Sequence, residues 1–164
     1  MLKFTQDDLI INLQIGEQVE IIDLRTCLAI NDGDLPKEYT QQPSWYAFYA
    51  SILASQEDKL ATVEREYTKY KADISLQLRQ GKLQILDSNN KSLKLTEGAI
   101  QNYIDTDEHT LIYQQKIQKM QTICKKLKSL VNGSIQRKDM LIQLGLLERQ
   151  ERKQIPMNNG LRQH

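Results

Sequence analysis

The sequence predicts a mainly α-helical protein, in which long heptad-patterned helices form a helical hairpin that oligomerises, preceded by a small N-terminal arm that fits short β-strands. Neither Gly nor Pro interrupts residues 44–80, and apolar residues recur there, and again after residue 110, at alternating spacings of three and four. In the arm, apolar residues instead occupy every second position. At 164 residues, with 40% hydrophobic and 26% charged residues, the chain has the size and composition of one ordinary globular domain.

The N-terminal arm, residues 1–40, is acidic, with eight acidic residues against three basic ones. Apolar residues at alternate positions flank Gly16-Glu17, and this pattern predicts a β-hairpin. Leu9, Ile10 and Leu13 also fit one helical face, and a lone hairpin is marginal without a surface to pack on, so both alternatives stay open. Residues 31–43 are dense in turn formers and are predicted to be a linker.

The first long helix is predicted to begin at Ser44 and to stop near Gly81, with a length of roughly 55 Å if it is continuous. Residues 87–95 have the composition of a polar loop. Thr96 is predicted to cap a short helix, and Asp105 with Glu108 resembles a capping box that opens the last long helix. A break is expected at residues 132–134, an apolar segment follows from 135 to 147, and the chain from Glu148 onward is expected to be frayed or disordered.

These elements predict three parts: the arm at 1–40, a helical DNA-binding and oligomerisation domain at 44–150, and a flexible tail at 151–164. Each long helix carries a narrow apolar seam that buries too little surface alone, so we expect the seams to join copies of the chain. An antiparallel hairpin within one chain is the alternative. The predicted oligomerisation residues are Leu60, Val63, Tyr67, Tyr70, Ile74, Tyr113, Ile117, Met120, Leu127 and Val131.

Several classes of function are excluded by what the sequence lacks. Two histidines, His109 and His164, cannot build a catalytic triad or a histidine metal site, and no glycine-rich phosphate loop is present. Cys27 and Cys124 are far apart and are expected to be reduced. We therefore expect no enzyme activity, no cofactor and no metal. With no apolar stretch for a membrane helix or signal peptide, the protein is expected in the cytoplasm, away from membranes.

The distribution of charge points to one candidate surface. The net charge is only +1, yet residues 110–138 contain seven basic residues and no acidic one. Such a block either binds a polyanion or is the solvated face of a helix, and the sequence leaves both readings open.

Four segments resemble the recombination mediator family of tailed bacteriophages, over about residues 43–151. They are Ser44-Trp45-Tyr46, Tyr67-Thr68-Lys69-Tyr70-Lys71-Ala72-Asp73, Lys94-Leu95-Thr96-Glu97-Gly98-Ala99-Ile100, and Gln136-Arg137-Lys138-Asp139-Met140-Leu141-Ile142-Gln143-Leu144-Gly145 followed by Glu148-Arg149. The last is the most distinctive. The acidic arm has no counterpart in the family.

The resemblance implies a non-enzymatic, ring-like homo-oligomer of six or seven subunits, in the cytoplasm of an infected bacterial host. It implies that the ring binds single-stranded DNA, contacts the phage recombinase and helps displace the single-strand-binding protein. The arm is then either a solvated tether or a segment that competes with DNA for a basic partner surface. A structural or assembly protein of a phage particle, built on the same seams and without a DNA role, is the alternative.

A Leu-Lys-Ala-Arg stretch is tied to DNA binding in the family and corresponds here to Tyr70-Lys71-Ala72-Asp73. Lys71 is retained, but Asp73 replaces the second base and would repel phosphate. Neighbouring bases and the basic block are therefore expected to contribute, while Tyr67 and Tyr70 are expected to be core residues rather than stacking platforms for bases. The predicted DNA-binding residues are Lys69, Lys71, Arg79, Lys82, Lys125, Lys126, Lys128, Arg137 and Lys138.

Overall fold

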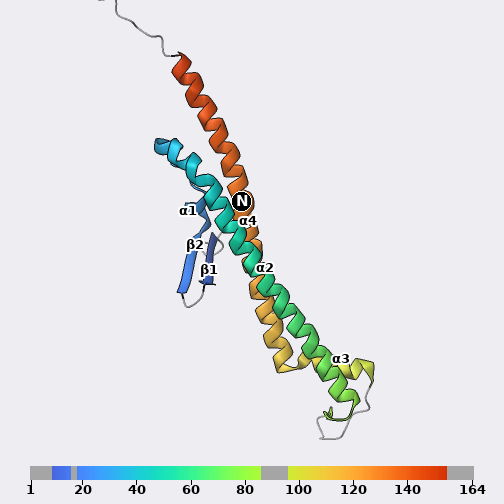
Figure 1. Cartoon of the computed structure of the whole chain (residues 1–164). Helices are drawn as coiled ribbons and strands as arrows, with labels where there is room; N and C mark the ends of the chain where they lie inside the picture. Colours follow the sequence, from blue (N-terminus) through green and yellow to red (C-terminus); the bar gives the residue numbers. More distant parts are fainter. Residues whose placement is uncertain (1–8, 16–17, 86–95, 155–164) are drawn as a thin grey trace, which may run out of the picture. The chain divides into compact units, whose positions relative to one another are not determined.

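The computed structural model describes residues 9–15, 18–85 and 96–154 (Figure 1). Two strands are followed by a short helix, a 3-10 turn, a 45-residue helix, a short helix and a 47-residue helix. This order confirms the predicted fold class: long helices with a small N-terminal β-hairpin. The elements are β1 (Ile10–Ile15), β2 (Gln18–Asp23), α1 (Leu24–Leu28), η2 (Asp32–Asp34), α2 (Leu35–Arg79), α3 (Glu97–Thr106) and α4 (Glu108–Gln154).

The chain forms two compact units that do not follow sequence order. Unit 1 joins residues 1–52 with residues 126–164, and unit 2 consists of residues 53–125. Both long helices contribute to both units. The division at 1–40, 44–150 and 151–164 stays a prediction, although α2 runs through its first boundary and α4 runs through its last.

In unit 1, β1 and β2 pair antiparallel, and the register places Ile11 opposite Ile22. Both side chains are buried, whereas Val19 and Ile21 lie on the other face with about two thirds of their surface exposed. The hairpin reading of the arm is therefore correct and the helical alternative is wrong, while the Gly16-Glu17 turn lies outside the described residues. Because Lys126 Nζ donates to the Ile10 carbonyl at 3.0 Å, the described arm is packed rather than a solvated tether.

The long helices of unit 1 run antiparallel, and a buried polar network joins them. Gln42 Nε2 of α2 donates to the Ser134 carbonyl of α4 at 2.6 Å, and Tyr39 donates to the Leu141 carbonyl. Around these contacts lies an apolar core from the hairpin and both helices, formed by Ile11, Leu13, Ile22, Leu24, Leu35, Tyr49, Leu127, Leu130, Val131 and Leu141.

Two predicted interruptions are absent from the helices. The predicted linker at 31–43 was wrong, because α2 begins at Leu35 and continues through Pro43. Burial of Leu35 and Gln42 holds this first part of α2 against the rest of unit 1.

The predicted break at residues 132–134 was also wrong, because Gly133 lies within α4. A Cβ at this position would come within 2.7 Å of Leu28 Cδ1. The glycine therefore allows α4 to approach α1 closely and does not kink the helix.

Unit 2 is a second antiparallel pairing of α2 with α4. Gln121 of α4 donates to Glu64 of α2 at 3.3 Å, and Gln114 of α4 donates to the Tyr67 hydroxyl of α2 at 3.2 Å. Residues later in α2 thus contact residues earlier in α4, as in an antiparallel pair. At the α3 end, a buried cluster formed by Ile74, Leu78, Ile100 and Ile104 closes the unit.

The ends of the helices follow local capping. Gly81 adopts a φ of 70° just after α2, where the helix was expected to stop, and Thr96 Oγ1 accepts from Ala99 N to begin α3. The cap of α4 was predicted wrongly at Asp105, which lies inside α3. Asp107 provides it instead, since its Oδ2 accepts from Thr110 N at 3.0 Å. The predicted polar loop at 87–95 lies outside the described residues.

The C-terminal part of the chain is helical further than expected. α4 continues to Gln154, so residues 148–154 are not frayed in this structure. The remainder of the predicted tail, residues 155–164, lies outside the described residues.

Candidate nucleic-acid interface

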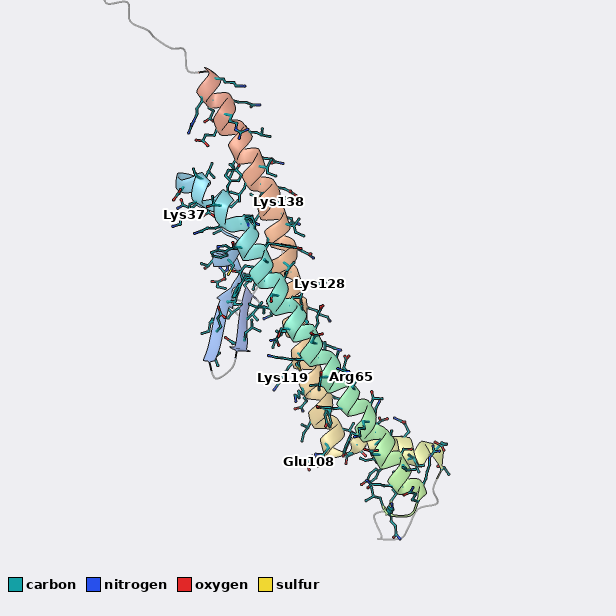
Figure 2. All side chains as sticks on the ribbon, viewed as in Figure 1. Lys37, Arg65, Glu108, Lys119, Lys128 and Lys138 are labelled. Atoms are coloured by element: carbon teal, nitrogen blue, oxygen red, sulfur yellow. The ribbon has the colours of Figure 1, made fainter. Side chains whose placement is uncertain are left out.

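The acid-free segment of α4 presents a series of exposed lysines. In unit 2 the seam positions Tyr113, Ile117 and Met120 are half-buried, whereas Lys116 and Lys119 are exposed. Lys116 lies at the edge of the seam, where it lines a hollow with Asp58 and Glu66 of α2. Lys128 and Lys138 are exposed on the part of α4 that belongs to unit 1 (Figure 2). Among the described residues no ion pair engages Lys116, Lys119 or Lys128, whereas Lys138 Nζ lies 3.8 Å from Asp139 Oδ1.

Two further bases of the segment are partly or wholly occupied in packing. Lys126 is half-buried and bonded to the carbonyl of Ile10. Arg137 is 8% exposed and donates to Glu38, to Gln42 Oε1 and twice to the Ala29 carbonyl, at 3.1 and 3.2 Å. This network holds the guanidinium inside unit 1, which argues against the predicted DNA contact by Arg137. Lys125 is exposed.

Lys71, which the family resemblance carries over, and the neighbouring bases Lys69, Arg79 and Lys82 have different surroundings. Lys71 Nζ lies 4.5 Å from the centre of the Tyr67 ring, and Arg79 pairs with Glu97 at 2.9 Å with both side chains exposed. Lys69 is two residues from Lys71 and therefore points to a different side of the helix. Lys82 is exposed in the turn after α2.

The tyrosines between these bases are half-buried and already stacked. The Tyr67 and Tyr70 ring centroids lie 5.7 and 5.6 Å from that of Tyr113, and the Tyr70 hydroxyl donates to Asp107 Oδ2 at 2.7 Å. Burial and this hydrogen bond raise the pKa of Tyr70 to about 12. Burial raises the pKa of Asp107, but hydrogen bonds from Tyr70 and Thr110 and the nearby His109 outweigh it, so the net shift is downward. The rings are part of the helix packing, as the sequence favoured.

All the predicted oligomerisation residues are buried or half-buried within one chain. Val63 and Ile74 are buried in unit 2, and Leu127 and Val131 are buried in unit 1. The seams therefore form the antiparallel hairpin that the sequence left as the alternative to a contact between chains. Oligomerisation stays a prediction and would need other surfaces.

A feature that sequence reasoning missed is an apolar groove in unit 1 of about 460 Å³. Its walls are Tyr39, Pro43 and Tyr46 on α2 and Ile135 and Ile142 on α4. The signal was present in the sequence, since Ile135 and Ile142 are seven residues apart and so share one helix face, but the segment was read only as generally apolar.

The described residues contain no group of three or more His, Cys, Asp or Glu side chains that could hold a metal ion. None of the helices in the described ranges is long and apolar enough to cross a bilayer.

No family model, curated protein or solved structure matches this chain. The resemblance to phage recombination mediators therefore rests on the residue patterns alone.

Proposed function

We propose that this chain is a recombination mediator: it binds single-stranded DNA as a homo-oligomer and promotes loading of a phage recombinase onto strands coated by single-strand-binding protein. The observation that carries the DNA part is the exposure of Lys116, Lys119 and Lys128 on an acid-free stretch of α4, without ion pairs among the described residues. The resemblance supplies the mediator part.

The mechanism needs neither a cofactor nor catalysis. Each exposed lysine neutralises a phosphate and releases a counterion, an effect that is weak for one chain and independent of base sequence. When several copies bind the same strand, the later contacts become intramolecular and their effects combine. The bound strand can then be transferred between coating proteins only if this protein has different affinities for the two DNA complexes.

Salt-dependent binding to a labelled oligonucleotide, followed by fluorescence anisotropy, tests the DNA part. We expect log affinity to fall linearly with log salt, by about 0.7 per phosphate neutralised on a single strand. Lys116→Ala/Lys119→Ala/Lys128→Ala should weaken binding at least tenfold at low salt and make this slope less steep, because up to three phosphate contacts are lost.

Two matched variants make the result specific. Lys37→Ala/Arg65→Ala/Lys153→Ala removes the same charge from other exposed positions and should leave binding within about twofold. Lys69→Ala/Lys71→Ala removes the base that the family resemblance places at the DNA, Lys71, together with its neighbour Lys69. If only this second variant weakens binding, DNA is bound on α2 and the α4 surface proposed here is wrong; a flat salt response of the wild type would reject DNA binding altogether.

The mediator part requires its own assay, with recombinase filament formation measured on strands coated by single-strand-binding protein. The protein should shorten the lag on coated strands and have little effect on bare ones. Absence of acceleration at every ratio, with DNA binding intact, would leave a plain single-strand-binding protein.

A structural or assembly role is the second candidate, because unit 1 exposes several large apolar side chains on α4 that suit protein contacts better than DNA. They are Ile135, Met140, Ile142, Leu146 and Leu147. Assembly of the purified protein without any affinity for single strands would favour this role.

A further inference from the structure

Unit 1 carries two separate apolar surfaces on the same part of α4. The first is the groove already described, which Ile135 and Ile142 line together with Tyr39 and Tyr46 of α2. These four side chains are 39–49% exposed. A second hollow, lined by Tyr39, Ile142 and Leu146, adjoins it through the two residues that both share. The groove is thus one end of a longer apolar channel between the two helices.

The second surface, which we call the ridge, consists of Met140 and Leu147. These side chains are 57% and 54% exposed and, seven residues apart, share one face of α4. At about 100° per residue, that face lies roughly 130° around the helix from the face of Ile135, Ile142 and Leu146. One copy of α4 therefore presents a concave and a convex apolar surface in different directions.

The charges around the two surfaces are complementary. Lys138, which lies 3.8 Å from Asp139, lines the groove. Arg149 and Arg152 line the adjoining hollow, where Glu148 is paired with Arg152. The exposed residues one turn from the ridge include no base; they are Gln136, Gln143, Gln150 and Glu151.

We infer that the groove of one copy receives the ridge of the next copy. The contact buries Met140 and Leu147 between Tyr39, Tyr46 and Ile142, and brings the exposed Glu151 of one chain toward the basic rim of its neighbour. Large exposed apolar surfaces on a soluble chain generally mark an interaction site. Here the same chain carries a surface of each shape with the matching charge.

The position of the two surfaces determines the type of assembly. Because they point in different directions, a partner that fills the groove leaves its own groove open, and the contact is head-to-tail. Such a contact closes into a ring or continues as a filament, whereas a two-fold dimer would use one surface twice. The inference rests on the oligomeric part of the proposed function and not on its DNA part, so its test contains no DNA.

Mixing two assembly-deficient variants provides the test, with mass measured by sedimentation velocity at micromolar concentration. Met140→Glu/Leu147→Glu removes the ridge and Ile135→Glu/Ile142→Glu removes the groove. Wild type should form particles larger than a dimer, and each variant alone should be monomeric. An equimolar mixture retains one intact groove and one intact ridge, and should form dimers and nothing larger.

The control Gln115→Glu/Gln118→Glu adds the same two charges to exposed positions of α4 in unit 2, outside both surfaces, and should assemble like wild type. Helical circular dichroism and thermal unfolding of each variant verify that it is folded. A monomeric wild type, variants that assemble like wild type, or a folded mixture that stays monomeric would each overturn the inference. If assembly is head-to-tail but single strands do not bind, the inference stands and the DNA function falls.

Discussion

Arg137 shows how a single residue in a basic run can serve the opposite purpose from its neighbours. Sequence reasoning grouped it with Lys138 because both lie in the acid-free block. Its partners Ala29, Glu38 and Gln42 are 95–108 residues away in the chain, so no local pattern could indicate that the guanidinium is buried. An arginine suits this position because its fork of five donors can reach three groups at once.

Replacing Arg137 should therefore affect stability rather than DNA binding. Arg137→Ala leaves Glu38 and the Ala29 carbonyl without their partner in a poorly hydrated site, and should lower the free energy of unfolding by about 3 kcal/mol. Lys138→Ala, next to it and exposed, should change that free energy by less than about 0.5 kcal/mol. Urea denaturation measures both, and equal effects from the two variants would refute the structural role.

At the scale of elements, the apolar spacing predicted both long helices. Gly81 correctly marked the end of α2, and Thr96 the start of the short helix α3. Prediction failed where tertiary contacts outweighed local preference. The predicted linker that ends at Pro43 is helical from Leu35, and Gly133 does not break α4 because the space it leaves is filled by Leu28. Asp107 displaced Asp105 as the cap because Tyr70, 37 residues earlier, adds a hydrogen bond that only the folded hairpin supplies.

The junction of α3 and α4 should make unit 2 sensitive to pH on both sides of neutrality. Since folding lowers the pKa of Asp107, its contribution is present above the ordinary value of 3.8 and is lost as the pH falls below it. Since folding raises the pKa of Tyr70 from 10.0 to about 12, its contribution is present below 10.0 and declines as the pH rises between these values.

Thermal unfolding midpoints measured across pH test this dependence. Asp107→Asn should reduce the acid-side loss of stability and Tyr70→Phe the alkaline-side loss. Asp105→Asn is the matched control, because that carboxylate accepts only an exposed hydrogen bond from Gln101. Identical acid profiles for Asp107→Asn and Asp105→Asn would contradict the assignment of the cap.

At the scale of the whole molecule, a heptad seam indicates that an apolar helix face must be covered. It does not indicate whether the covering helix belongs to the same chain or to a second copy. The rings of Tyr67 and Tyr113, which belong to the two predicted seams, stack on each other, and this pairing answers the question for unit 2. The groove and the ridge escaped prediction because each depends on which helix face the other elements leave uncovered. The exposure of Lys119 and Lys128 was predictable, since most bases between seam positions face solvent. The half-burial of Lys126 was not, because it depends on the hairpin, 116 residues away.

The intramolecular seam has a measurable consequence in a chain that cannot assemble through its ridge. In the Met140→Glu/Leu147→Glu background, Leu127→Ala should lower the free energy of unfolding by 2–5 kcal/mol, roughly the usual range for a buried leucine. The denaturation midpoint of that background should not change with protein concentration. A midpoint that rises with concentration would mean that the seams join separate chains.

The interleaved make-up of unit 1 imposes an order on synthesis at the ribosome. The Ile10 carbonyl meets its partner Lys126 only after 116 further residues have been added, and the inner side chains of the hairpin wait equally long for Leu127 and Leu130. At translation rates of roughly 5 to 20 residues per second, that delay is about 6 to 23 s. Unit 2 also needs residue 125, so it is completed only one residue before Lys126, and the N-terminal strands remain without their α4 partners throughout this delay. During that interval the strands are open to pairing with nascent chains on neighbouring ribosomes.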